Sequence, residues 1–309
     1  VLVLISGGGS SLFTLPAPGI ALADKQAVTR ALLKSGAPIS DINCVRKHLS
    51  AVKGGRLALA AQPAAVTSLI ISDVPGDDPA IVASGPTVPD PTTREQALSI
   101  LQKYQIAIPA AVRSWLDDPA SETPKPGERA FARGENRIIA CARDALSAAA
   151  RNAEAQGIPV VDLGDAIEGE AREVARTHAK LALAYARERR PCLLISGGET
   201  TVTVRGAGRG GRNSEYALAL ALALDGAAGI WAIACDTDGI DGTETNAGAL
   251  VAPDTLARGK NQAADAQAAL SNNDAYGFFQ TLGDLVGTGP TRTNVNDFRA
   301  ILVQPDKKP

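Results

Sequence analysis

Methionine is absent from this 309-residue sequence, which also contains two histidines, four cysteines and 4% aromatic residues. The cysteines form no CxxC pair, so they predict buried, reduced thiols and a cytoplasmic protein rather than a disulfide framework or a zinc ribbon. With only His48 and His178 available, a zinc site or a histidine-centred catalytic triad lacks its ligands. We therefore expect both histidines to be structural.

An excess of charge of either sign is also missing. The chain carries 31 lysines and arginines against 33 aspartates and glutamates, a formal net charge of −2, and it has no long basic block. This balance argues against a nucleic-acid partner. No uninterrupted run of about 18 apolar residues occurs, so we expect no membrane partner. Hydrophobic residues at 45% and charged residues at 21% are typical of a folded chain of about two domains.

The sequence begins at Val1, within an apolar run, and has no initiator methionine. We interpret it as part of a longer protein, or as a sequence from which an N-terminal stretch and the methionines were omitted. In the second case, some of the spacings used below are short by a residue.

Apolar runs alternate with amphipathic segments along the whole chain, which predicts an α/β architecture. We expect strands at 1–5, 66–71, 137–140, 158–163, 192–196 and 230–234, and helices at 23–35, 41–49, 92–104, 142–156, 168–190 and 214–224. The polar, proline-rich stretch 117–128 is the best linker candidate, which gives domains of 1–120 and 121–309. Each is expected to be an α/β domain with a largely parallel sheet flanked by helices.

A Ser-Gly-Gly triplet follows an apolar strand twice, at 6–8 and again at 196–198. Because ligands bind beyond the carboxyl ends of strands in open α/β sheets, two such loops suggest two half-sites that face a shared cleft between the domains. Tight turns explain the same residues equally well. The candidate substrate- or phosphate-binding residues of these loops are Ser6, Gly7, Gly8, Gly9, Ser10, Ser11, Gly197, Gly198 and Glu199.

The stretch 206–211 satisfies GxGxxG between an expected strand and an expected helix, and Asp236 follows the next strand. This pattern fits a dinucleotide-binding fingerprint, and hence an NAD(P)H-dependent reductase. Three nearby arginines (Arg205, Arg209 and Arg212) fit a triphosphate or phosphoryl group better, because guanidinium groups and helix N-termini bind such charges. A surface hairpin with solvated arginines is the third interpretation. The candidate phosphate-binding residues here are Gly210, Gly211 and Asn213.

Three aspartates, Asp236, Asp238 and Asp241, follow the strand at 230–234. Carboxylates at the carboxyl end of a strand suit a Mg²⁺ ion that keeps most of its waters, and one of them could orient or deprotonate a hydroxyl group. Their spacing excludes an EF-hand. An Asp/Gly turn with capping carboxylates is the competing interpretation.

Two further segments are candidates for binding an anionic substrate. The polar loop 288–297 carries Thr291, Asn294 and Asn296, and loops of this composition line sites as well as forming ordinary turns. Arg46 and Lys47 lie in an expected helix, where they either meet an anionic substrate or form a solvated cationic face.

Several long blocks of the sequence resemble glycerate 2-kinases of the bacterial and animal type, a family whose second domain is named MOFRL. The blocks occur in the family's order along the whole chain; they are ISGGGSSL (5–12), NCVRKHLSAVKGGR (43–56), SDVPGDDPAIVASGPTVPDP (72–91), ISGGET (195–200), GGRNSE (210–215), TDGIDG (237–242) and TGPTRTNVNDF (288–298).

This resemblance implies ATP-dependent phosphorylation of D-glycerate at its 2-hydroxyl group, with Mg²⁺, in a cleft between a Rossmann-like domain and a MOFRL domain. It also implies that Arg212 holds the charge of the transferring phosphate and that Asp238 binds the metal or acts as a base. The family has a preceding segment with an active-site lysine, so we expect that lysine to be missing here; Lys47 is not its equivalent. Family members often carry hydroxypyruvate reductase names.

Three functions stay open at this point. The first is an ATP-dependent kinase that acts on D-glycerate or a close hydroxy acid. The second is an NAD(P)H-dependent hydroxypyruvate reductase, and the third is a non-catalytic module that binds a nucleotide or a sugar acid. The apolar surface expected for the helix at 214–224 would permit a homodimer.

Overall fold

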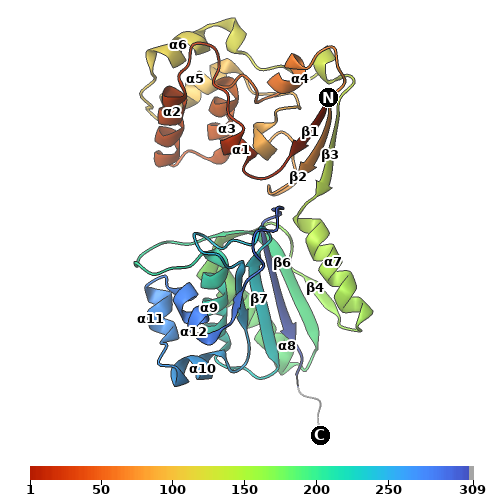
Figure 1. The fold of residues 1–309 in the computed structure, drawn as a ribbon, viewed down its shortest axis with the longest axis vertical. Coiled ribbons are helices and arrows are strands. Elements are labelled where there is room, and N and C mark those ends of the chain that lie inside the picture. Colours follow the sequence, from red (N-terminus) through yellow and green to blue (C-terminus); the bar gives the residue numbers. More distant parts are fainter. Residues whose placement is uncertain (306–309) are drawn as a thin grey trace. The chain divides into compact units, whose positions relative to one another are not determined.

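The computed structural model describes residues 1–305 of the chain and divides into two compact units at Ala140 and Cys141 (Figure 1). The first unit is built around a three-stranded sheet and the second around a seven-stranded sheet. Both sheets are flanked by helices, so the expected α/β class with two domains is confirmed.

The sheet of the first unit is fully parallel, in the order β1-β2-β3. Its strands are β1 (Leu2–Ile5), β2 (Thr67–Ile71) and β3 (Glu135–Ala140). The α-helices of this unit are α1 (Gly9–Leu12), α2 (Leu22–Lys34), α3 (Ile39–His48), α4 (Arg56–Ala60), α5 (Arg94–Lys103) and α6 (Ala110–Asp117). Short 3₁₀ turns lie at Val82–Ser84, Pro119–Ser121 and Arg129–Phe131.

A helical subdomain forms the larger core of the first unit. The apolar faces of α2, α3, α5 and α6 meet there, and their buried residues include Val28, Leu32, Val45, Leu101 and Leu116. A smaller core under the sheet contains Ile5 and Ile70. His48 has the structural role expected for it, because it is fully buried and its Nδ1 lies 2.9 Å from the carbonyl oxygen of Cys44.

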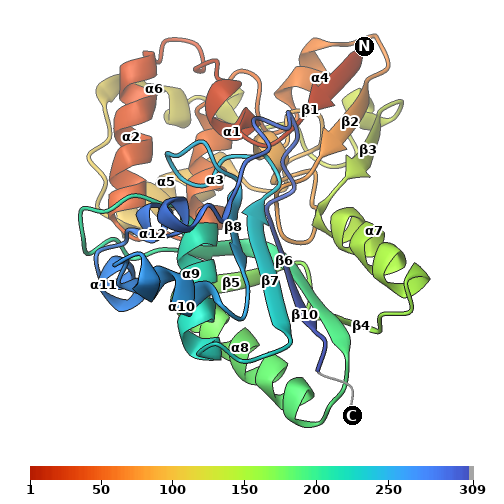
Figure 2. The same ribbon diagram turned by 60° about the horizontal axis from the view of Figure 1, so that its bottom comes forward.

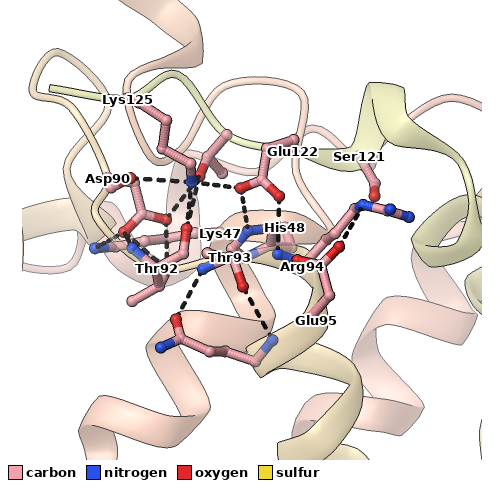
Figure 3. Close-up of polar contacts among 12 residues, drawn as sticks. Lys47, His48, Asp90, Thr92, Thr93, Arg94, Glu95, Ser121, Glu122 and Lys125 are labelled. Carbon is pink, nitrogen blue, oxygen red and sulfur yellow. Dashed lines mark hydrogen bonds and ion pairs between the residues drawn. The ribbon is translucent and has the colours of Figure 1, made fainter. Parts of the chain in front are cut away.

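The stretch predicted to be a linker is an ordered part of the first unit. Figure 3 shows Glu122 and Lys125 directed into a polar network around the buried carboxylate of Asp90. Lys125 bonds to the carbonyl oxygen of Asp90 at 3.2 Å, and the amide of Arg94 donates to Glu122 at 3.1 Å. The chain then adds β3 to the same sheet, so the observed boundary lies at 140 rather than at the predicted 120.

The sheet of the second unit is mixed rather than largely parallel, which corrects the expectation for this half. Its order is β4-β6-β10-β7-β8-β9, with β5 also paired to β6. The strands are β4 (Val160–Asp162), β5 (Ile167–Glu170), β6 (Cys192–Thr201), β7 (Ile230–Asp236), β8 (Gly248–Val251), β9 (Leu285–Val286) and β10 (Asp297–Val303). The last strand returns between β6 and β7 and is antiparallel to both (Figure 2).

Helices cover both faces of this second sheet. They are α7 (Ala142–Ala155), α8 (Ala171–Arg187), α9 (Arg212–Leu224), α10 (Thr255–Asn261), α11 (Ala266–Ser271) and α12 (Ala275–Leu282). Residues of α7 pack on Ile195 and Ala300, whereas α8 and α9 pack on the opposite face, around Leu194 and Ile301. His178 of α8 is again structural, since its Nδ1 lies 2.8 Å from the hydroxyl oxygen of Tyr216.

The apolar surface of α9 is not available for a homodimer. Nearly every residue of this helix is buried against α8, β7 and β8 of its own unit, including Tyr216, Leu218 and Leu220. The alanine- and leucine-rich sequence therefore belongs to a central core helix, and the predicted dimer surface was wrong. Within residues 1–305, no helix is long and apolar enough to cross a membrane.

Candidate active site

The second Ser-Gly-Gly triplet does not form a turn. Residues 196–198 lie inside β6, which continues without interruption from Cys192 to Thr201. Gly198 has φ +125°, and a Cβ atom there would lie 2.3 Å from the backbone nitrogen and oxygen of Ile167 in β5. Glycine is thus required for β5 to pair with β6, and the prediction of a ligand-binding loop at Gly197 and Gly198 is corrected.

One edge of the second sheet gathers charged residues from four elements. In the strand register, Asp297 at the start of β10 stands opposite Gly198 on one side and Asp236 at the end of β7 on the other. Because β10 is antiparallel to both neighbours, its first residue lies at the same edge as their last residues. Glu199 of β6 and Arg212 at the first position of α9 complete this set.

Arg212 is held by three carboxylates, one on each guanidinium nitrogen. Its Nε bonds to Asp297 at 2.7 Å, one terminal nitrogen to Asp236 at 2.7 Å, and the other to Glu199 at 2.8 Å. Burial acts to lower the pKa of Arg212, but the carboxylates outweigh it and raise that pKa above its ordinary value. A guanidinium group has five N–H donors, so about two of them remain for a further anion.

Asp297 is the central residue of this cluster, and the sequence analysis did not single it out. Its carboxylate is fully buried, bonds Asn213 at 2.8 Å through the same oxygen that takes Arg212, and directs its other oxygen to Arg299 and the amide of Thr200. The sequence could have pointed to Asp297 through its position, because it is the last polar residue of the block TGPTRTNVNDF.

The three aspartates predicted to bind metal have separate roles. Asp236 pairs with Arg212, and burial raises the pKa of Asp236 to about 6 although that guanidinium opposes the shift. Asp238 is half-buried and accepts the amide of Ile240 at 2.7 Å. Within residues 1–305, no group of three or more His, Cys, Asp or Glu side chains could hold a metal ion. The prediction of a metal site formed by all three aspartates is therefore corrected. Among the described residues, one carboxylate oxygen of Asp238 accepts no hydrogen bond.

Asp241 serves as the N-terminal cap of α9. Its side chain is 1% exposed and accepts the amides of Asn213 and Ser214 at 2.9 and 2.8 Å, together with the hydroxyl group of Ser214. Burial raises the pKa of Asp241, and these bonds oppose the shift. The amide of Asn213 is thus occupied and is not free for the expected phosphate contact, whereas the phosphate contact expected at Gly211 stays a prediction.

The GxGxxG stretch has most of its amides bonded within the protein. The amides of Arg205 and Gly206 bond to Asn273, those of Ala207 and Gly208 bond to Asn272, and that of Arg209 bonds to Asp274. A phosphate-binding glycine loop needs such amides directed at its ligand. The dinucleotide fingerprint therefore lacks its donors over 205–209, while Gly210 and Gly211 follow between this segment and α9.

The polar loop 288–297 is bonded to the end of β7. Thr291 donates its hydroxyl to the carbonyl oxygen of Thr237 at 2.6 Å, and its amide donates to the carbonyl oxygen of Asp238 at 3.0 Å. Asn294 accepts the amide of Asn296, whose carbonyl oxygen in turn accepts the hydroxyl of Thr237. These bonds place Thr291 beside Asp238, as the prediction of a site-lining loop requires.

In the first unit, residues 6–8 connect β1 to α1, and this glycine turn with the first residues of α1 contacts two cations. Arg46 and Lys53 both donate to the carbonyl oxygen of Ser10, the lysine at 2.9 Å. Lys53 also reaches the carbonyl oxygens of Gly9 and Ala83, at 3.4 and 3.3 Å. The structure thus brings Arg46 to the predicted glycine turn, and it adds Lys53, which the sequence analysis missed within the block NCVRKHLSAVKGGR.

Lys47 does not take part in this arrangement. It is buried, and its Nζ lies 3.4 Å from Asp90 in the network of Figure 3. Adjacent residues of a helix point in different directions, so Arg46 faces the glycine turn while Lys47 faces the core. The prediction that Lys47 binds an anionic substrate is corrected for this reason.

Lys25 of α2 is a second lysine that the sequence analysis missed. Its side chain is 5% exposed, and burial together with the nearby Arg46 lowers the pKa of Lys25 from 10.5 to about 8. The unfolded chain then holds the proton more tightly between these values, so folding stability rises as the pH increases through this range.

We expect the Lys25→Met variant to lose this pH dependence. Between pH 8 and 10.5, the free energy of unfolding of the wild type should rise relative to that of the variant by on the order of 3 kcal/mol. Urea titrations at several pH values measure the difference. Lys34→Met, an exposed change on the same helix, is the control and should follow the wild type; parallel curves for wild type and Lys25→Met contradict the prediction.

Comparisons with known proteins identify the relatives of this chain. Residues 1–117 match the family model described as domain of unknown function (DUF4147), and residues 192–297 match the MOFRL family. A protein of Thermotoga maritima named D-glycerate 2-kinase is 42% identical over 301 residues, which cover 96% of this chain and 70% of that protein. A putative hydroxypyruvate reductase of Agrobacterium vitis is 56% identical over 310 residues, which cover 98% of this chain and 70% of that one.

Two solved structures also match nearly the whole chain. The crystal structure of glycerate kinase from Thermotoga maritima matches with a TM-score of 0.91 at 42% identity, covering 98% of this chain and 72% of that one. A Pyrococcus horikoshii structure matches with a TM-score of 0.84 at 39% identity, covering 99% and 72%. The chain belongs to the glycerate kinase family, the family that carries the MOFRL domain.

Proposed function

We propose that this protein transfers the terminal phosphoryl group of ATP to the 2-hydroxyl group of D-glycerate and releases ADP and 2-phosphoglycerate. The observation that carries the proposal is the 42% identity to a protein named D-glycerate 2-kinase over 96% of the chain. The free cysteines Cys44, Cys192 and Cys235 support a reducing compartment such as the cytoplasm as the location.

Arg212 is the residue that we assign to the transferring phosphate. Phosphoryl transfer requires positioning and charge stabilisation more than covalent chemistry from the protein. The carboxylates of Asp236, Asp297 and Glu199 fix the plane of this guanidinium group, which leaves its remaining N–H donors pre-oriented. Those carboxylates outnumber the nearby cations Arg212 and Arg299, so this edge favours a phosphate that arrives with Mg²⁺ over a bare one.

Asp238 is the candidate for contact with the Mg²⁺ of the nucleotide or for holding the proton of the substrate hydroxyl. Mg²⁺ bound to a nucleotide keeps several waters and needs only one or two protein carboxylates. Asp238 is half-buried at the end of β7, and Thr291 fixes its backbone. Within residues 1–305, the amide of Ile240 donates to one oxygen of this carboxylate, and the other oxygen is left for this role.

A paired assay tests the proposal against the reductase alternative. One arm contains ATP, Mg²⁺ and D-glycerate and is followed for ADP and 2-phosphoglycerate; the other contains NADH and hydroxypyruvate and is followed at the NADH absorbance. Because the chain covers 70% of the length of its Thermotoga maritima relative, both the 309-residue chain and any version extended before Val1 are assayed. We expect ADP and 2-phosphoglycerate with a flat NADH trace. NADH loss without ADP, or nucleotide binding without turnover in the extended version, overturns the proposal.

A further inference from the structure

We propose that the first unit contains a phosphate-binding pocket built by Lys25, Arg46 and Lys53. The pocket lies among α2, the glycine turn after β1, and α3, and it has a volume of about 240 Å³. Its polar lining also includes Arg30 and the hydroxyl-bearing residues Ser10 and Ser11. The inference concerns binding by the first unit alone, and it holds whether or not the chain phosphorylates glycerate.

The side chain of Lys25 is the first observation. Lys25 lines the pocket and is 5% exposed, which means that it is 95% buried. Its Nζ has no hydrogen-bond partner among the described residues. A buried ammonium group without a partner is strongly unfavourable, because it loses its hydration and gains nothing in return. An acceptor that enters the pocket removes this penalty.

The charges around Lys25 are the second observation. Arg46 and Lys53 lie in the same pocket, and their hydrogen bonds within residues 1–305 go to backbone carbonyl oxygens. In that part of the chain, none of the three cations forms an ion pair with a carboxylate, and no Asp or Glu lines the pocket. Burial and the two neighbouring cations lower the pKa of Lys53 to about 7, as expected for mutual repulsion.

The class of ligand follows from charge and size. Three converging cations are neutralised by an anion of two or more charges, and phosphate is such an anion near neutral pH, whereas a single carboxylate carries one charge. Arg46 and the two serines add directional donors that phosphate oxygens accept. A volume of about 240 Å³ lies below the 300–1,000 Å³ of pockets that enclose whole drug-sized ligands, so it suits a phosphate group or a small phosphorylated molecule.

A purely structural role explains Lys53 but not Lys25. Lys53 ties the glycine turn to Ala83, which has φ +51°, and so it supports the local fold. Lys25 holds no segment in place, and its ammonium group only adds repulsion. A buried lysine whose ammonium group has no hydrogen-bond partner among the described residues fits a site that a ligand completes.

Thermal melting and calorimetric titration with inorganic phosphate test the inference on wild type, Lys25→Met and the control Lys34→Gln, an exposed change on the same helix. We expect phosphate to raise the melting temperature of wild type and control. In Lys25→Met, the ligand-free melting temperature should be higher than in wild type, while phosphate affinity falls at least tenfold. Equal phosphate affinity in wild type and Lys25→Met, or no phosphate binding by wild type, overturns the inference. Should Lys25→Met not fold, Arg46→Gln is titrated and judged by the same tenfold criterion.

The source of the phosphate group is identified by competition. ATP without Mg²⁺, 2-phosphoglycerate and D-glycerate are each added to protein titrated with phosphate. Displacement by ATP or by 2-phosphoglycerate names the natural source, and D-glycerate, which lacks a phosphate group, should displace none. Displacement by D-glycerate as strong as that by 2-phosphoglycerate overturns the assignment to phosphate. This experiment measures binding and does not depend on turnover, so it can be interpreted even if the kinase assay shows no activity.

Discussion

Replacing Arg212 with alanine should lower turnover with ATP and D-glycerate by about 10³-fold, the loss typical of removing an arginine that stabilises a transferring phosphoryl group. The reason is geometric as well as electrostatic, because its three carboxylate partners fix the guanidinium plane before substrate arrives. Steady-state rates of ADP release measure the effect. Because the same change leaves Asp236 without its cation, we also expect the pKa of Asp236 to rise further.

Two variants separate this role from a general loss of charge. Arg209→Ala removes an exposed arginine from the loop that precedes α9. This arginine stacks over Tyr276 at 4.6 Å, and its loss should change turnover little. Arg212→Lys keeps the charge but loses the fork that meets three carboxylates, so most of the activity should still be lost. Turnover within threefold of wild type in folded Arg212→Ala would falsify the assignment.

The second large effect is on stability. Asp241→Ala removes an acceptor of three hydrogen bonds and leaves the amides of Asn213 and Ser214 buried without partners. Because hydrogen bonds to a charged group contribute about 1.5–3 kcal/mol each and are not additive, we expect the free energy of unfolding to fall by roughly 3–5 kcal/mol. Chemical denaturation with a matched m-value measures this change.

Asp265→Ala is the control for the capping role of Asp241. Asp265 also accepts two amides at a helix start, those of Gln267 and Ala268, but it is exposed. Removing an exposed cap costs about 1 kcal/mol, because water replaces the lost acceptor. Similar losses for the two variants would show that burial of Asp241 contributes nothing.

Many elements up to β7 could be predicted from the sequence, but β5 was expected as part of a helix, and no helix or strand after β7 was expected. The pairing of the strands could not be predicted. Periodicity located α2, α3, α5 and β2 to within a few residues. The antiparallel entry of β10 between β6 and β7 leaves no local trace, since a strand buried on both faces has the same apolar pattern in either direction. The stretch 117–128 has the composition of a linker, but long-range bonds to Asp90 and Arg94 hold it in the first unit.

Some residues of the candidate sites could be found from the sequence, and others only from the tertiary structure. Arg212 and Arg46 are identifiable because family blocks contain them. Whether a basic residue faces a pocket or the core depends on helix rotation, and this distinguishes Arg46 from its neighbour Lys47. Lys25 could not be found from sequence, because only the tertiary structure shows that its ammonium group has no partner among the described residues.

Two glycines of the 206–211 stretch limit which residues can occur at these positions in related sequences. A Cβ atom at Gly206 would lie 2.2 Å from the carbonyl oxygen of Asn272, and one at Gly208 would lie 2.7 Å from the same atom. Backbone obstructs both positions, so no side-chain change elsewhere can accommodate a larger residue there. Glycine at these two positions should therefore persist in relatives that have lost the phosphoryl-transfer reaction, and its presence in a new sequence identifies the fold rather than the activity.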